Sequence, residues 1–291
     1  MIGVQKSATT SVQHFLHSHP GVMMPMGEVA CFESPDYEHG RFESQLSFVR
    51  SKGDCLAGIK RPDLFPNTLA MRRLHRHAPQ TKLLVILRNP IDRFVSAYFH
   101  LMNSGKIPVR NINRAVCSMF NDDYFLRHPA GLSLLHYGLY SDHLETIERL
   151  WGQERILALS HQRIAQQPSV VHELICEFLG LEPFEMEQTG SSWKNRGSYS
   201  YARALFLRPS NLLKYRFHSG RVRKEIRPGI VPRYVGGALS RLARQLPATS
   251  VNPKTVLDRS SRAALVEYFR ADVTCLAERR PGLVEWAEEF E

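Results

Sequence analysis

The chain has 291 residues, of which 43% are hydrophobic and 23% charged, and this composition is ordinary for a globular protein with a core of its own. Its formal net charge is +10, and no stretch approaches the roughly 18 consecutive apolar residues of a membrane span. These values exclude a membrane-spanning segment in this sequence, and they favour a single domain over residues 1–291.

The first 16 residues place a turn of small residues between a strand and a helix. Residues 1–4 read as the end of a buried strand, and an amphipathic helix is predicted from Val12. The first N–H groups of a helix have no partner inside it, and the helix dipole adds partial positive charge there. With Lys6 beside them, these groups predict a phosphate or sulfate site. The alternative is a helix capped by Thr9 or Thr10, with Lys6 in solvent.

Strands and helices then alternate, which is typical of an α/β protein. Short strands are predicted at residues 21–25 and 56–60. The continuous apolar run 82–87 indicates a parallel strand buried on both faces. It leads through Asn89, a helix cap, and Pro90 into a helix over residues 91–102.

The second half of the chain continues the alternation and then loses it. A helical face spans residues 144–151, a strand follows at 156–159, and a helix from Pro168 ends at Gly180. Between residues 183 and 253 glycine, proline and arginine accumulate, so loops and short helices are expected there. A last helix is predicted at about residues 261–278.

The junction LLVILRNPIDRFVSAYFH predicts a second anion site. Arg88 ends a central strand, where open α/β sheets bind ligands, and its guanidinium offers a two-pronged donor to phosphate. Ser96 lies about two helical turns further on and adds a hydroxyl in the same direction. The alternative is that Arg88 pairs with Asp92 at the start of the helix.

Together the two junctions resemble the binding motifs of sulfotransferases that use 3′-phosphoadenosine 5′-phosphosulfate (PAPS). VQKSATTS is similar to their 5′-phosphosulfate loop, and the stretch around Arg88 is similar to their 3′-phosphate motif. The resemblance is greatest to the carbohydrate branch, of the heparan sulfate type. It implies a three-layer, P-loop-NTPase-like α/β fold with a central parallel sheet flanked by helices. Shorter stretches that agree in order are GEVACFES, GIKRPDLF, GLYSDHLETIERLW, SWKNRGSY and PGLVEW.

This resemblance implies which residues bind the donor. Lys6 and the following backbone amides would hold the 5′-phosphate and the sulfuryl oxygens, and Lys6 would stabilise charge on the leaving phosphate. Arg88 and Ser96 would hold the 3′-phosphate, and a late loop would close over the nucleotide. The loop amides are those of Ser7, Ala8, Thr9, Thr10 and Ser11, and the late-loop residues are Lys194, Arg196 and Gly197.

For the reaction, the resemblance implies in-line transfer of a sulfuryl group to an acceptor hydroxyl, and its carbohydrate branch implies that this hydroxyl belongs to a carbohydrate. Glu28 is the predicted base, and His14, His17 and His100 are its rivals. Lys60 would bridge the sulfuryl group and the acceptor, or else pair with Asp63. No metal is expected, because no carboxylate–histidine cluster has ligand spacing.

The sequence also departs from the family pattern. Ala8 stands where the loop usually has glycine, and alanine fits without strain only with a negative φ. Ala30 stands where the branch often has histidine, and the paired cysteines of Golgi members near the late loop are missing.

The excess positive charge lies in one segment. Residues 194–244 hold 13 lysines and arginines and a single acid, Glu225. Such a segment, here about residues 194–250, predicts a basic and loop-rich cover over donor and acceptor that faces an anionic partner. An acidic carbohydrate and a solvated or membrane-facing surface are equally open choices for this segment, and nucleic acid is disfavoured.

Two other function classes and the compartment remain as expectations. A nucleotide-dependent kinase is disfavoured because the GxxxxGK[ST] loop is missing, and a non-enzymatic binder of nucleic acid or lipid would use the arginine-rich segment. The five cysteines form no CxxC pair, so a reducing cytoplasm is expected. A lumenal catalytic domain whose anchor lies upstream is the alternative.

Overall fold

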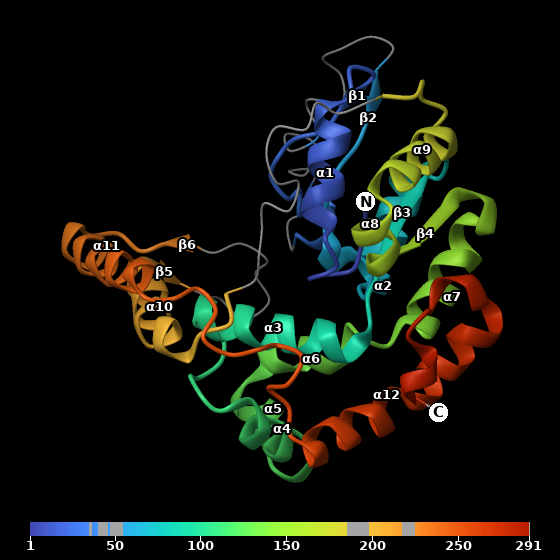
Figure 1. The fold of residues 1–291 in the computed structure, drawn as a ribbon. Helices are drawn as coiled ribbons and strands as arrows, with labels where there is room; N and C mark the ends of the chain where they lie inside the picture. Colours follow the sequence, from blue (N-terminus) through green and yellow to red (C-terminus); the bar gives the residue numbers. More distant parts are fainter. Residues whose placement is uncertain (35–36, 40–45, 47–54, 185–197, 217–224, 291) are drawn as a thin grey trace.

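The computed structural model describes residues 1–34, 37–39, 46, 55–184, 198–216 and 225–290 (Figure 1). Among these residues, no helix has both the length and the apolar character needed to cross a membrane. The helices are α1 (Thr9–Ser18), α2 (Thr68–His77), α3 (Pro90–Ser104), α4 (Ile112–Asn121), α5 (Tyr124–Arg127), α6 (Leu132–His136), α7 (Tyr140–Trp151), α8 (His161–Gln166), α9 (Pro168–Leu179), α10 (Tyr201–Lys214), α11 (Ile230–Gln245) and α12 (Arg259–Arg279). The strands are β1 (Val22–Met23), β2 (Leu56–Ala57), β3 (Leu83–Leu87), β4 (Ile156–Ser160), β5 (Tyr215–Arg216) and β6 (Glu225–Ile226).

Parallel segments form the centre of the molecule. Strand β1 pairs with β2, and β3 pairs with β4 in the register Leu83↔Ile156. Residues 1–4 run between these pairs: Ile2 N donates to Leu84 O at 3.0 Å, and Arg61 N donates to Met1 O at 3.0 Å. The order across the sheet is therefore β1, β2, residues 1–4, β3 and β4, and the predicted central parallel sheet is confirmed.

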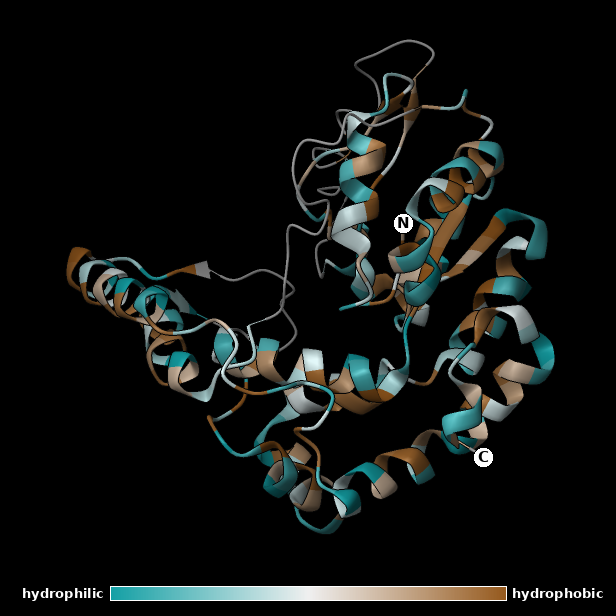
Figure 2. Cartoon of the chain, viewed as in Figure 1, coloured by the Kyte–Doolittle hydropathy of each residue, from teal (hydrophilic) through white to brown (hydrophobic). Residues whose placement is uncertain are grey.

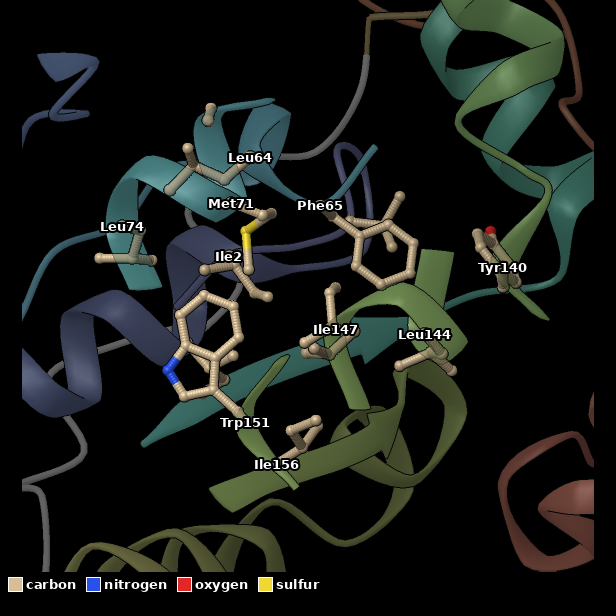
Figure 3. Packing of buried hydrophobic residues seen from close by; sticks show 14 of the residues in the cluster. Ile2, Leu64, Phe65, Met71, Leu74, Tyr140, Leu144, Ile147, Trp151 and Ile156 are labelled. Carbon is tan, nitrogen blue, oxygen red and sulfur yellow. The ribbon is translucent and has the colours of Figure 1, made fainter. Parts of the chain in front are cut away.

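Helices cover both faces of this sheet because alternate residues of β3 point in opposite directions. Leu83, Val85 and Leu87 pack into one buried cluster with α2 and α7 (Figure 3). Leu84 and Ile86 pack on the other side with α1 and α9. The fully buried run thus makes the three layers that the sequence predicted.

The helix after β3 begins where the sequence indicated. The Asn89 side chain accepts hydrogen bonds from Ile91 N at 2.9 Å and Asp92 N at 3.3 Å, and Pro90 is the first helical residue. Gly105 ends α3 with φ 88°, a left-handed conformation that glycine adopts without strain. A further cluster packs α3 against α4, α6 and α12, so this long helix connects the sheet to a helical layer.

The expected loops and short helices between residues 183 and 253 are wrong for the described part. Helices α10 and α11 fill most of it, and they form an antiparallel pair that projects from the body (Figure 1). Pro209 lies inside α10 without ending it. Gly236 lies where a Cβ atom would come within 3.1 Å of Ser210 O, so this glycine permits the close approach of the two helices. The predicted helix breakers therefore serve packing.

Candidate functional site

A cavity of about 740 Å³ lies at the carboxyl ends of the parallel segments. Its lining includes residues that directly follow these segments: Lys6, Arg88 after β3, and His161 after β4. This is the edge at which α/β sheets bind ligands. The predicted site residues that line it are Lys6, Ala8, Thr9, Thr10, Ser11, Glu28, Lys60, Arg88 and Ser96.

Some predicted residues lie elsewhere. The Ser7 side chain is fully buried, does not line the cavity, and leaves its Oγ atom without a partner. Lys194, Arg196 and Gly197 lie outside the described residues. The structure therefore gathers most of the predicted side chains, while the role of each one stays a prediction.

The loop before α1 has a left-handed backbone at two positions. Lys6 has φ 74° and Ala8 has φ 62°, so the negative φ that would let an alanine fit here without strain is not what the loop has. The cause is the tight turn, in which Ser7 N donates to Val4 O at 3.2 Å and Ser11 N donates to Ala8 O at 3.0 Å. A left-handed alanine costs about 1–2 kcal/mol, which explains why glycine is usual at this position.

No side chain caps the start of α1. Its N-cap residue is Ala8, whose side chain has no hydrogen-bond acceptor. The alternative of a helix capped by Thr9 or Thr10 is therefore not what the structure has. The first N–H groups of the helix remain donors for a ligand. Burial, with Arg88 as a second cause, lowers the pKa of Lys6. An anion between these groups would offset the charge of both cations.

Arg88 connects the two junctions. Its Nη1 atom donates to Lys6 O at 3.0 Å, while Nη2 lies 4.0 Å from Asp92 Oδ2. The alternative pairing with Asp92 is therefore present, but as a long contact. The Nε atom is buried without a partner. Ser96 is 4% exposed and lines the same cavity from α3.

Glu28 and Lys60 lie together at the other side of the loop. Lys60 Nζ donates to Thr10 Oγ1 at 3.2 Å and lies 3.6 Å from Glu28 Oε1. Burial lowers the pKa of Lys60 more than Glu28 raises it. The Glu28 side chain is 41% exposed, so a ligand in the cavity can reach it. From α1, the Gln13 side chain donates to Pro25 O at 2.7 Å and Gly27 O at 3.3 Å, which fixes the loop that carries Glu28.

The sequence analysis missed Arg61, which joins three carboxylates. It contacts Glu28 at 2.7 Å, Asp63 at 2.8 Å, and Glu33 in a short hydrogen bond. Asp63 is therefore bound by Arg61, and the alternative Lys60–Asp63 pair is not formed. Burial opposes its charge, but the surrounding carboxylates raise the pKa of Arg61. These partners lie up to 33 positions away along the chain, so no local pattern indicated this cluster.

The histidines divide into two groups. His100 lines the cavity, whereas His14 and His17 do not, and His17 Nδ1 lies 2.7 Å from Met24 O. His161 also lines it and was not predicted. Burial, followed by the charge of Arg88, lowers the pKa of His161 to about 4, so this imidazole is neutral at neutral pH.

Further lining residues come from α3 and the segment before α10. Asn103 is one of them, and the spacing Ser96, His100, Asn103 follows one helical face, a signal that the sequence contained. Lys106 adds a cation, and Ser198 and Tyr199 close the far side. Among the described residues, no three His, Cys, Asp or Glu side chains lie together as a metal site would need.

The fold and the cavity define an α/β protein with an anion-binding site at the carboxyl edge of its sheet. The sequence model of the "Sulfotransferase domain" family matches residues 1–197. The chain belongs to this sulfotransferase domain family. The family predicted from the two junctions is thereby confirmed, and the predicted enzyme class agrees with it, in preference to a kinase or a non-enzymatic binder.

Two individual relatives support the same family. The chain is 29% identical over 187 residues to "Heparan sulfate glucosamine 3-O-sulfotransferase 6" from Homo sapiens, covering 62% of this chain and 52% of that one. It is 26% identical over 195 residues to "Bifunctional heparan sulfate N-deacetylase/N-sulfotransferase 2" from Bos taurus, covering 63% and 22%. The matched part of this chain thus spans about half of the length of the first relative and about a fifth of the length of the second.

A solved structure has the same fold. The sulfotransferase from Alicyclobacillus acidocaldarius superposes with a TM-score of 0.63 and 17% identity, covering 96% of this chain and 93% of that one. This likeness supports the three-layer fold predicted from the sequence.

Proposed function

We propose that this protein transfers a sulfuryl group from PAPS to a hydroxyl of a carbohydrate acceptor. The observation that carries the proposal is the cavity that joins Lys6, the uncapped start of α1, Arg88 and Ser96. Two cations and a helix start at one edge of a sheet suit a nucleotide with anionic groups at two ends. PAPS supplies the sulfuryl group and a phosphate leaving group.

The residues present fit this donor. Arg88 has a buried Nε atom without a partner, and the start of α1, whose residues Thr9 and Thr10 line the cavity, has no side-chain cap. Lys6 and these N–H groups would hold the 5′-phosphate end, and Arg88 with Ser96 would hold the 3′-phosphate. Lys6 then stabilises negative charge on the leaving oxygen, which is worth roughly 3 kcal/mol for one well-placed donor.

Glu28 would act as the base toward the acceptor hydroxyl. It lines the cavity, is partly exposed, and is oriented by Lys60 and Arg61. Lys60, which also contacts Thr10, lies between the donor loop and this acid and would orient the sulfuryl oxygens. His100 and His161 are the lining imidazoles that can accept a proton in its place.

The acceptor is proposed from the relatives, whose names specify heparan sulfate glucosamine. In the lining, Lys60 and Arg61 are paired with Glu28 and Asp63, so Lys106 is the cation that an acidic group of the sugar would meet. For the compartment, we propose a reducing one, since all five cysteines are free. We also propose that the reaction needs no metal.

Calorimetry with the product nucleotide, 3′-phosphoadenosine 5′-phosphate (PAP), tests the donor site. The protein should bind PAP at least about 100-fold more tightly than ADP, because ADP lacks the 3′-phosphate that Arg88 and Ser96 would hold. Arg88→Gln and Ser96→Ala should reduce this preference, and Lys6→Ala should weaken both ligands. Ser104→Ala is the matched control: Ser104 is buried on the same helix, bonds Leu101 O and does not line the cavity.

Equal binding of PAP and ADP by the folded protein would reject the donor assignment.

The base is tested with N-sulfated heparan oligosaccharides as acceptors. Glu28→Gln should lower kcat by about 10²–10⁴-fold without changing PAP affinity. Glu33→Gln is the control, because Glu33 shares Arg61 as partner but does not line the cavity. A normal kcat in Glu28→Gln, with loss in His100→Gln or His161→Gln, would transfer the role to that histidine.

A further inference from the structure

The antiparallel pair α10–α11 forms an arm, here defined as residues 201–216 and 225–245. The arm is attached to the body through α10: Asn211 Nδ2 donates to Asn103 O at 2.7 Å, and Arg208 Nε donates to Ile107 O at 3.3 Å. Helix α11 packs on α10 with its inner face, where Ser210 Oγ bonds Gly236 O at 2.6 Å. Figure 1 shows α11 at the far end of the arm.

The outer face of α11 is apolar and exposed to solvent. Ile230 and Val231 are each 71% exposed, and Tyr234 is 76% exposed. Val235 and Leu242 continue the same face at 46% each. These residues stand at i, i+1, i+4, i+5 and i+12 from Ile230, which places them on a stripe about 140° wide, on the side of the helix away from the packed Gly236 and Ala243. In Figure 2 the outer tip of α11 is brown, and teal, white and brown residues alternate along the rest of the helix.

Positive charge accompanies the stripe. On α11, the exposed Arg233 and Arg244 lie at one edge of the stripe and Arg241 lies within it, and Arg216 and Arg227 are exposed before the helix begins. Between residues 201 and 245 the sequence contains a single acidic residue, Glu225. An exposed apolar stripe accompanied by arginines matches the pattern of helices that lie in the headgroup region of a membrane.

Other occupants fit these observations less well. A second copy would bring the arginines of two arms together, and like charges at an interface oppose association. A polyanionic sugar chain would pair with the arginines but would leave the aliphatic stripe in water. An anionic lipid surface suits both the arginines and the apolar stripe, because headgroup phosphates contact the arginines and acyl chains contact the stripe.

We propose that the arm docks on an anionic lipid surface, with the outer stripe of α11 entering the headgroup region. The cavity is connected to the arm, because the lining residues Ser198 and Tyr199 lead directly into α10 and Asn103 is bonded to it. The protein would thus meet acceptors that are held at a membrane. The docking itself does not depend on the proposed sulfotransferase activity.

Sedimentation of the full chain with vesicles tests the proposal. The protein should bind phosphatidylcholine mixed with phosphatidylglycerol at least about tenfold more tightly than phosphatidylcholine alone. Val231→Glu with Tyr234→Glu should weaken this binding at least about tenfold, and Arg233→Gln with Arg241→Gln should do the same. Leu126→Glu is the control, because Leu126 is 81% exposed but lies on α5, outside the arm.

Several results would overturn the proposal. These are no binding to either vesicle, equal binding to both, or undiminished binding by Val231→Glu with Tyr234→Glu. Loss in the arginine variant alone would indicate a polyanion surface, and dimers of the wild type that the stripe variant abolishes would indicate a second copy. Val231→Ser with Tyr234→Ser repeats the test without added charge. Lys6→Ala should bind vesicles normally and the arm variants should bind PAP normally, which separates this test from that of the donor site.

Discussion

Arg88 donates a hydrogen bond from Nη1 to the backbone carbonyl of Lys6 at 3.0 Å. The side chain that follows β3 therefore fixes the backbone of the loop that precedes α1. The two motifs are 82 residues apart in sequence, yet they form one rigid edge of the cavity. A substitution at one of them should for this reason disturb the ligand contacts of the other.

The first prediction concerns this coupling. Lys6→Ala and Arg88→Ala should each weaken PAP binding by at least about tenfold, and the double variant should lose less than the sum. The coupling energy should be about 0.5–3 kcal/mol, because removing Arg88 already loosens the Lys6 backbone. Calorimetric titration of the four proteins measures it. In the control cycle, Arg155→Ala takes the place of Arg88→Ala. Arg155 also donates to a backbone carbonyl, Gln80 O at 3.0 Å, but it does not line the cavity. Additive losses in both cycles would contradict the coupling.

A second prediction follows from the left-handed Ala8. Ala8→Gly should relieve about 1–2 kcal/mol of backbone strain and return part of it through the more flexible unfolded chain. A net gain of about 0.5–1 kcal/mol in unfolding free energy is expected from urea titration. Ala78→Gly provides the comparison, since Ala78 has φ −146° and should lose stability on the same change. If Ala8→Gly is destabilising as well, the loop is not strained.

Local patterns in the sequence account for much of the fold. The apolar run ending at Leu87 predicted a strand buried on both faces, and Asn89 with Pro90 predicted the start of α3, because burial and capping act over a few residues. The same locality explains the errors. Pro209 and Gly236 read as helix breakers, yet packing of α10 on α11 outweighs their low helix propensity.

For the candidate site, the sequence indicated the residues that belong to contiguous motifs. The ion pairs of Arg61 could not be predicted from the sequence, because its carboxylate partners Glu28 and Glu33 lie on a separate loop. The place of His161 in the cavity lining could not be predicted either, because a histidine after a strand indicates nothing about the site until the strand order is known. Only the parallel pairing of β3 and β4 brings it to the same edge as Arg88.

A third prediction compares two adjacent glycines in α11. A Cβ atom at Gly236 would lie 2.9 Å from Lys214 Cγ and 3.1 Å from Ser210 O, whereas one at Gly237 would meet nothing within 4 Å. Gly237→Ala should stabilise the helix by about 1 kcal/mol. Gly236→Ala should instead cost about 1–3 kcal/mol through overpacking. Thermal denaturation followed by circular dichroism measures both. Equal effects of the two changes would show that α11 does not pack closely on α10.

A fourth prediction concerns acid stability. Burial, followed by the charge of Arg88, lowers the pKa of His161 from 6.5 to about 4. Between these pH values the unfolded chain binds the proton more readily than the folded protein, so stability falls as the pH is lowered through this window. The full contribution is retained above pH 6.5 and lost by pH 4. At pH 5 the loss due to His161 is about 2 kcal/mol.

His161→Gln removes this proton, so the variant should gain about 2 kcal/mol relative to the wild type when the pH is lowered from about 7.5 to 5. Urea denaturation of both proteins at the two pH values measures the change. The comparison cancels any loss of packing in the variant, because that loss is present at both pH values. A difference that stays constant with pH would mean that His161 binds its proton equally well in the folded and unfolded chain. The imidazole would then be as accessible to water as in the unfolded state, and His161 would lose its place as a neutral proton acceptor in the donor cavity.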